Sequence, residues 1–143
     1  MALLRFHIFI LLIFISLFGV SQTSYNLEAS TDGQLINTCN ATVYDEGGPS
    51  GDYTSNSDYE ITFASTNNSF IRAVLKYHEF EDTYDYLIIY DGQSSSTGMV
   101  LDSITRFPLV TVNENGNAYY AQSGYITIRI TSDGGTNKGG FEL

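Results

Sequence analysis

The sequence predicts an all-β protein built as an antiparallel β-sandwich. Short runs rich in Tyr, Ile, Val, Phe and Thr alternate with clusters of Gly, Ser, Asn and Asp, which is the pattern of strands separated by turns. After the first twenty-one residues, no stretch sustains an apolar period near 3.6 with helix caps, so little or no helix is expected. A chain of 143 residues is long enough for one domain of this kind and not for two.

Residues 1–21 are predicted to be a signal peptide. Arg5 precedes an almost unbroken run of Ile, Leu and Phe over residues 8–20, and the small residues Gly19 and Ser21 suit cleavage after Ser21. The run is short for a bilayer span, which makes an uncleaved N-terminal anchor helix the weaker alternative. We therefore expect a secreted protein, extracellular or at the cell surface, that meets the membrane only transiently during export.

The strands are expected at intervals along the rest of the chain. Residues 22–36 are polar with scattered apolar positions and predict a linker or a loose first strand, while residues 37–143 predict the domain itself. Two longer strands are expected at 71–80 and 86–90, and weaker ones at 100–101, 109–112 and 118–121.

Two further strands alternate clearly enough to assign their faces. In the first, apolar Tyr59, Ile61 and Phe63 oppose polar Asp58, Glu60 and Thr62; the second opposes Ile126, Ile128 and Ile130 to Tyr125, Thr127, Arg129 and Thr131. Because successive side chains of a strand point to opposite faces, this pattern predicts strands that are buried on one side only.

Charge and cysteine content exclude several kinds of partner and site. The chain has 16 acidic residues against 6 Lys and Arg, a net charge of −10, so it lacks the basic face that nucleic acid requires. A single cysteine, Cys39, excludes a disulfide within the chain and a zinc site with two or more thiolates.

The densest group of acids predicts a cation site. Five carboxylates fall within thirteen residues and would repel one another without a cation or water to screen them. Oxygen ligands of this kind suit calcium, although the spacing is not that of an EF-hand. The alternative is a solvated acidic turn between two strands. The five residues are Glu79, Glu81, Asp82, Asp85 and Asp91.

Two segments together resemble the CUB domain family. Residues 80–92 read FEDTYDYLIIYDG, similar to the family's pattern of an acid followed by Y-D-x-L-x-I-Y-D-G. Residues 130–141 read ITSDGGTNKGGF, similar to its S-D loop followed by G-F. The order and separation of the segments, and the start near Cys39, extend the resemblance over roughly residues 37–143. It implies a compact β-sandwich of jelly-roll type that serves as an extracellular binding module.

The resemblance also implies a calcium site. In calcium-binding members the ligands match Glu81, Asp85 and Asp133 of this sequence, with the carbonyl of Gly134 and the side chain of Asn137 as weaker candidates. Three carboxylates from two distant segments make poor neighbours without a cation. The alternative is a carboxylate cluster that is only solvated or hydrogen-bonded to Tyr84 and Ser132.

The sequence departs from the family in its loops. The loop before Asp85 is short and has no cysteine, so Glu79 or Asp82 is an alternative to Glu81 as a ligand. The residues Ser103 to Phe107 stand where the family has a Cys-Gly pair. Both departures are more similar to bacterial secreted members.

No enzyme motif is present. His78 is the only histidine after residue 21, and the sequence has no G-x-S-x-G nucleophile elbow and no H-E-x-x-H motif. We expect His78 to be an ordinary strand residue.

The sequence therefore predicts a secreted, non-catalytic module, stabilised by calcium, that binds a protein or glycan, with a basic side chain of the partner facing the acids. It is expected to belong to a larger extracellular protein, because the alternation at residues 139–143 predicts a strand cut short at the C-terminal end of the domain. The alternatives are an N-terminal accessory domain of a secreted hydrolase, most plausibly a peptidase, and a metal-free structural or adhesion module.

Overall fold

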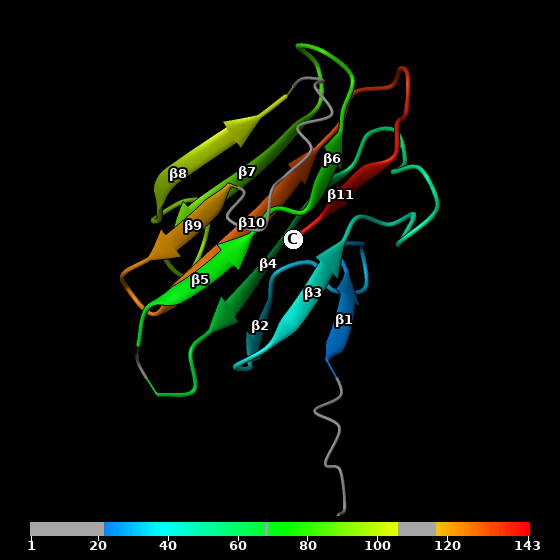
Figure 1. The fold of residues 1–143 in the computed structure, drawn as a ribbon. Coiled ribbons are helices and arrows are strands. Elements are labelled where there is room, and N and C mark those ends of the chain that lie inside the picture. The colour runs from blue at the N-terminus through cyan, green and yellow to red at the C-terminus, as the bar shows by residue number, and fades with distance from the viewer. Residues whose placement is uncertain (1–21, 68, 106–116) are drawn as a thin grey trace, which may run out of the picture.

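A computed structural model describes residues 22–67, 69–105 and 117–143. These residues form eleven strands and no helix (Figure 1), and thus no helix long and apolar enough to span a membrane. The signal peptide expected at residues 1–21 and the weak strand expected at 109–112 lie outside the described ranges. The strands are β1 (Thr23–Asn26), β2 (Gln34–Asn37), β3 (Ala41–Tyr44), β4 (Asp58–Ala64), β5 (Ile71–Val74), β6 (Tyr77–Glu79), β7 (Tyr86–Asp91), β8 (Met99–Ile104), β9 (Ala118–Ala121), β10 (Tyr125–Thr131) and β11 (Gly140–Glu142).

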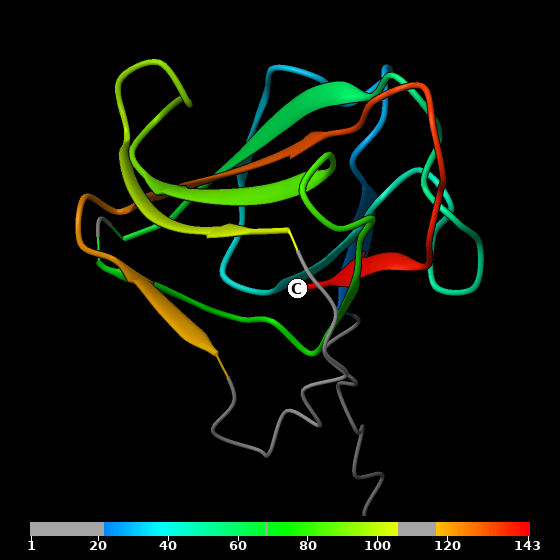
Figure 2. The ribbon, with the colours of Figure 1, turned by 90° about the horizontal axis from the view of Figure 1, so that it is seen from above.

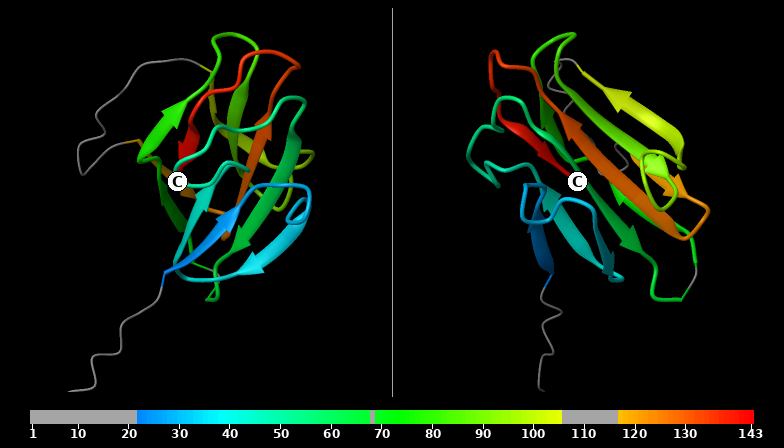
Figure 3. Two further views of the ribbon diagram at one scale, coloured as in Figure 1. Left: turned by 90° about the vertical axis from the view of Figure 1, so that its right-hand side faces the viewer. Right: turned by 180° about the vertical axis from the view of Figure 1, so that it is seen from behind.

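The strands form two layers, which Figures 2 and 3 show from above and from the side. One layer is a five-stranded sheet in the order β2-β4-β10-β7-β8. The other contains a four-stranded sheet, β1-β3-β11-β6, and the two-stranded sheet β5-β9. All neighbouring strands are antiparallel except the pairs β1 with β3 and β2 with β4, which are parallel.

The core lies between the layers and is filled by the apolar faces predicted from the alternation. Ile61, Ile126, Ile128 and Ile130 are at most 2% exposed, and they meet Phe141 from the opposite layer. Burial of several such side chains, each stabilising by roughly 1.5–3 kcal/mol, holds the layers together.

The segment expected to be a linker or loose first strand holds two paired strands. Residues 22–36 include β1 in the four-stranded sheet and most of β2 in the five-stranded sheet. Between them Leu27 is fully buried, and its N–H donates to the carbonyl of Tyr44 at 2.7 Å. This stretch therefore passes from one layer to the other and is anchored at the crossing.

Two threonines on the outward face of β4 and β10 are buried, which the alternation did not predict. The hydroxyls of Thr62 and Thr127 lie 2.7 Å apart. Thr127 also donates to the carbonyl of Gly92 at 2.9 Å, and Thr62 to that of Gln93 at 3.1 Å. The connection after β7 thus folds over this part of the sheet and covers it.

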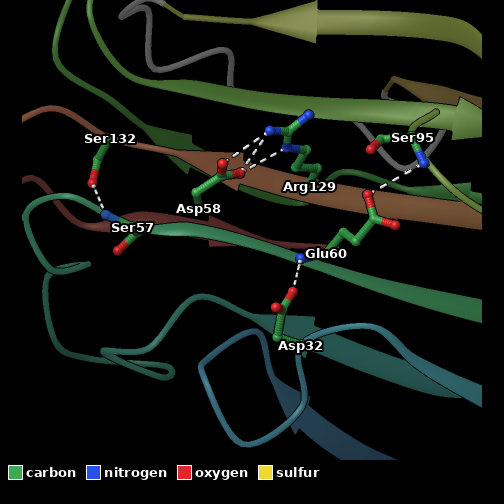
Figure 4. A network of polar contacts seen from close by, with 7 residues as sticks. All are labelled: Asp32, Ser57, Asp58, Glu60, Ser95, Arg129 and Ser132. Carbon is green, nitrogen blue, oxygen red and sulfur yellow. Dashed lines mark hydrogen bonds and ion pairs between the residues drawn. The ribbon is translucent and has the colours of Figure 1, made fainter.

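The rest of the outward face carries a polar network (Figure 4). Arg129 on β10 donates from Nε and Nη2 to the two carboxylate oxygens of Asp58 on β4, at 2.8 and 3.0 Å. Glu60 accepts from the N–H of Ser95 at 3.2 Å, and its own N–H donates to Asp32 at 2.8 Å. Each acid of this face therefore has a donor within reach.

Candidate metal centre

Three connections meet at one end of the sandwich, toward the upper right in Figure 1: residues 45–57 after β3, 80–85 after β6, and 132–139 after β10. They bring together Glu81, Asp85 and Asp133, each of which offers a carboxylate oxygen within 4.8 Å of the other two. We call these three residues the acid cluster. Two of its members are separated by 48 residues in the sequence, so the fold itself assembles it.

Asp85 is the fixed member of the acid cluster. It stands directly before β7 and is 1% exposed. One carboxylate oxygen accepts from the hydroxyl of Tyr53 at 2.5 Å, and the other accepts from the N–H of Asp133 at 2.9 Å. A buried carboxylate requires such donors, and these two bonds hold Asp85 against both neighbouring connections.

Tyr53 links the three connections. Its ring packs against Phe80, with centroids 5.4 Å apart, and its hydroxyl accepts from the N–H of Glu81 at 3.1 Å while donating to Asp85. Burial, followed by the hydrogen bond to the Asp85 carboxylate, raises the pKa of Tyr53 above its usual value. The phenol therefore stays protonated at neutral pH and remains a donor to Asp85.

Glu81 and Asp133 are less buried and are approached by backbone N–H groups. Thr136 donates to Glu81 at 3.2 Å, and Gly135 donates to Asp133 at 2.6 Å. A Cβ atom on Gly135 would lie 2.9 Å from an oxygen of Asp133 and 3.2 Å from one of Glu81. Glycine at position 135 thus lets the backbone come close to both carboxylates.

The other residues considered as ligands lie apart from these three carboxylates. Glu79 accepts from the hydroxyl of Tyr77 at 2.7 Å, and Asp82 is exposed; neither belongs to the group of three acids. The side-chain oxygen of Asn137 accepts from Ser55 at 3.0 Å. Gly134 follows Asp133 directly and lies beside the side chain of Asn56. The assignment of five residues as metal ligands remains a prediction: Glu81, Asp85, Asp133, Gly134 and Asn137.

The acid cluster has the chemistry of a calcium site. Calcium binds oxygen at 2.3–2.6 Å, so two ligands of one ion lie at most about 5 Å apart, and the 4.8 Å limit of the three oxygens fits this. Ion pairs between described residues join Lys76 to Glu142 and Arg129 to Asp58, and neither includes an acid of the cluster. Three carboxylates so close together favour a cation between them.

Comparison with known proteins identifies the fold. No family model and no curated protein matches the chain. Among solved structures, the MASP-1 CUB2 domain bound to Ca²⁺ is similar with a TM-score of 0.57 and 19% identity, over 78% of this chain and 95% of that one. The CUB1-EGF-CUB2 domains of rat MASP-1 give a TM-score of 0.60 and 14% identity over 76% of this chain.

The full extracellular region of zebrafish Gpr126/Adgrg6 is also similar, with a TM-score of 0.59 and 14% identity over 76% of this chain. The chain spans only 13% of that structure and 40% of the rat structure. The predicted all-β sandwich with a CUB-like fold is therefore confirmed.

Sequence reasoning missed the role of Tyr53. It lies 32 residues from Asp85, in a segment that carries no local signal for contact with an acid. The tyrosine itself, between two turn-rich stretches, gives no indication of which side chain it reaches. Only the packing of the connections reveals it.

Proposed function

We propose that this chain is a non-catalytic extracellular binding module whose end loops hold a calcium ion through Glu81, Asp85 and Asp133. The observation that carries the proposal is the convergence of three carboxylate oxygens within 4.8 Å at the end of a CUB-like sandwich. The Ca²⁺ bound to the similar MASP-1 CUB2 domain supports it.

Calcium would join two connections that otherwise touch through few polar contacts. Glu81 and Asp85 belong to the connection after β6, and Asp133 to that after β10. The carbonyl of Gly134, the side chain of Asn137 and water would supply the further oxygens that calcium requires. The ion would thus fix the end of the sandwich.

The same end would present the binding surface. Asp133 is exposed and Glu81 is partly exposed, so their outer oxygens remain accessible when inner oxygens bind the ion. A basic side chain of a protein partner fits this surface by charge, and a glycan hydroxyl fits by coordination to the ion. The domain would act within a larger extracellular protein, and residues 1–21 would direct its export. N-terminal sequencing of the secreted product would test whether these residues are cleaved.

Thermal unfolding of residues 22–143 with calcium and with a chelator tests the site. A ligand at a hundredfold excess over Kd stabilises the folded state by about 2.7 kcal/mol, and we expect a rise in Tm of roughly 10 °C. Glu81→Gln and Asp133→Asn should remove most of this rise.

Asp58→Asn is the matched control, because it removes one carboxylate charge that Arg129 already pairs. It should leave the calcium-dependent rise in Tm unchanged. A Tm that calcium and chelator leave the same in the unsubstituted protein would contradict the proposal.

A further inference from the structure

The two-stranded sheet β5-β9 carries two exposed aromatic rings in contact. Phe70, directly before β5, is 57% exposed, and Tyr120 on β9 is 48% exposed. Their ring centroids lie 6.2 Å apart, with 50° between the ring planes. The other ring contacts between described residues each include a buried ring of the core. Phe70 and Tyr120 thus contact each other at the surface, outside the core.

Alternation along β5 places an arginine beside these rings. Ile71 and Ala73 pack against the core, so Arg72 between them points away from it. Tyr120 is directly opposite Arg72 in the strand register and therefore lies on the same face. Phe70, two residues before Arg72, continues this face. We call Phe70, Arg72 and Tyr120 the aromatic patch.

The aromatic patch lies in a basic part of an acidic chain. The chain has 16 Asp and Glu against 6 Lys and Arg, yet residues 65–78 and 117–132, which contain both strands, have three of the cations and no acid. Arg72 is exposed, and no described residue forms an ion pair or a side-chain hydrogen bond with it. Its guanidinium is therefore available to an anion from outside the chain.

Two acids form hydrogen bonds with β9 or the two residues after it. Asp102 accepts from the hydroxyl of Tyr119 at 2.8 Å. Asp91 accepts from the N–H groups of Gln122 and Ser123, at 2.8 and 3.0 Å. Both acids stand on strands of the five-stranded sheet, in the opposite layer. They therefore leave the positive charge of the aromatic patch in place.

The side chains of the aromatic patch specify the chemistry of a ligand. The face of an aromatic ring is negative, so it attracts the weakly positive C–H groups on the flat side of a sugar ring. A guanidinium holds a carboxylate through two parallel N–H groups. A sugar that carries a carboxylate satisfies both kinds of group at once.

A protein partner fits the aromatic patch less well. Each partner in a typical protein interface contributes roughly 800 Å², and the exposed parts of three side chains supply well under that area. Hot spots of such interfaces also lie in desolvated pockets, whereas both rings here are about half exposed. The small area and the exposed rings favour a glycan.

We propose that the aromatic patch binds a glycan that contains uronic acid. A sugar ring stacks on Phe70 and Tyr120, and a carboxylate of the same glycan faces Arg72, which stands about 7 Å from Phe70 along the strand. In Figures 1 and 2 the strands β5 and β9 lie toward the left, and the connection 132–139 with Asp133 lies toward the right. The aromatic patch is therefore separate from the acid cluster and needs no calcium.

The test titrates tetragalacturonate, a chain of four uronic acid units, into the protein and follows backbone amide signals by NMR. EDTA is present, so that calcium cannot join the sugar to the acid cluster. We expect shifts at Phe70, Arg72 and Tyr120. The methyl-esterified tetramer has the same rings without carboxylate charge, and it should bind about tenfold more weakly.

Variants separate the guanidinium from the rings. Arg72→Gln should remove the preference for the acid over the ester, whereas Tyr120→Ala should weaken binding of both sugars at least about tenfold. Phe70→Ala, outside β5, repeats the ring test if Tyr120→Ala does not fold. Lys76→Gln is the matched control for Arg72→Gln, because it removes the same charge from an exposed side chain that already pairs with Glu142. It should leave the preference unchanged.

Three outcomes would overturn the proposal. The absence of amide shifts excludes a glycan site at the aromatic patch. Binding of the peptide acetyl-(Glu)4-amide as tight as that of the sugar acid assigns the patch to acidic peptides. A mass by light scattering that doubles with concentration, together with its loss in Arg72→Gln, assigns the patch to a second copy of the chain.

Discussion

Two acidic regions at the same end of the sandwich handle carboxylate charge in opposite ways. Asp45, fully buried after β3, accepts from the N–H of Gly47 at 2.8 Å and from that of Phe141 at 2.9 Å. It therefore connects the end of β3 to β11 through groups of the chain itself. The acid cluster instead brings three carboxylates together, and they differ in the number of hydrogen bonds that they accept.

The difference separates an acid whose oxygens are satisfied within the fold from acids that we propose to bind a cation. Backbone N–H groups satisfy both oxygens of Asp45, so it needs nothing from outside the protein. In the acid cluster, the buried Asp85 accepts two hydrogen bonds, whereas Glu81 and the exposed Asp133 each accept one from a backbone N–H. Each of the three acids also offers an oxygen within 4.8 Å of the other two. Loss of Asp45 contacts should thus affect folding, and changes at the cluster should affect calcium.

The largest expected effect is at Gly140, which packs on the Asp45 carboxylate. Gly140 has φ of +70°, and a Cβ there would lie 1.7 Å from Oδ2 of Asp45. Gly140→Ala combines overpacking with left-handed backbone strain, and we expect unfolding free energy to fall by about 4 kcal/mol. Urea unfolding measures this.

Gly33→Ala is the matched control for Gly140→Ala. Gly33 has a similar φ of +68°, but a Cβ atom there would have no other atom within 4 Å. Only backbone strain remains, so a loss of about 1 kcal/mol is expected. Equal losses in the two variants would show that contact with Asp45 has no part in the effect.

The second prediction concerns pH. Burial raises the pKa of Asp45 from 3.8 to about 6, against the lowering effect of its backbone hydrogen bonds. Because the folded pKa lies above the unfolded one, this group contributes most stability below pH 3.8 and loses it as pH rises through 6. The loss amounts to about 3 kcal/mol.

Urea unfolding of the unsubstituted protein and Asp45→Asn at pH 4 and pH 7 checks this. The stability difference, unsubstituted minus variant, should shrink by about 2.4 kcal/mol between the two values, because Asp45 of the unfolded chain is already partly ionised at pH 4. Comparison with the variant cancels the pH dependence that the two proteins share. A difference that is constant with pH would contradict the prediction.

The third prediction separates the cluster from ordinary packing. Tyr53→Phe keeps the ring against Phe80 but removes the hydroxyl that contacts Asp85 and Glu81. We expect a stability loss of about 1–2 kcal/mol and a calcium affinity about tenfold weaker, measured by unfolding and calorimetry.

Tyr119→Phe removes a comparable hydroxyl elsewhere. Tyr119 is 9% exposed and donates to Asp102 at 2.8 Å. It should lose similar stability with calcium affinity unchanged. Equal affinities in the two variants would refute a positioning role for Tyr53.

Periodicity predicted most of the fold because burial on one face imposes it. The alternation of residues 58–64 and 125–131 placed Ile61 and Ile128 in the core, where they lie. It failed at Thr62 and Thr127, since cover by a distant connection leaves no trace in a strand's own sequence. The parallel pairing of β1 with β3 and of β2 with β4 was missed for a similar reason, because it depends on the partner strands.

In the candidate site, too, residues within recognisable motifs were predicted, and residues that depend on distant contacts were not. Glu81, Asp85 and Asp133 were predicted from the resemblance of two motifs, and the fold places them together. Neither Tyr53 nor Asp45 was assigned a role, because each has a partner far along the chain: Glu81 lies 28 residues from Tyr53, and Phe141 lies 96 residues from Asp45. Side chains that organise a site from a distance are visible only after folding.

The smallest effect on unfolding free energy is expected at Asp58, an acid that is neither buried nor clustered but paired with an exposed cation. Its carboxylate pairs with the Arg129 guanidinium at 2.8 Å on the outward face (Figure 4), where the two side chains are 62% and 32% exposed. Water screens such a pair, so Asp58→Asn should lower unfolding free energy by at most about 1 kcal/mol. The loss should shrink further at about 1 M salt, where the screening length is about 3 Å. A salt-independent loss above this size would show that Asp58 shares the structural role of Asp45, and the contrast between buried and exposed acids would then no longer hold for this end of the sheet.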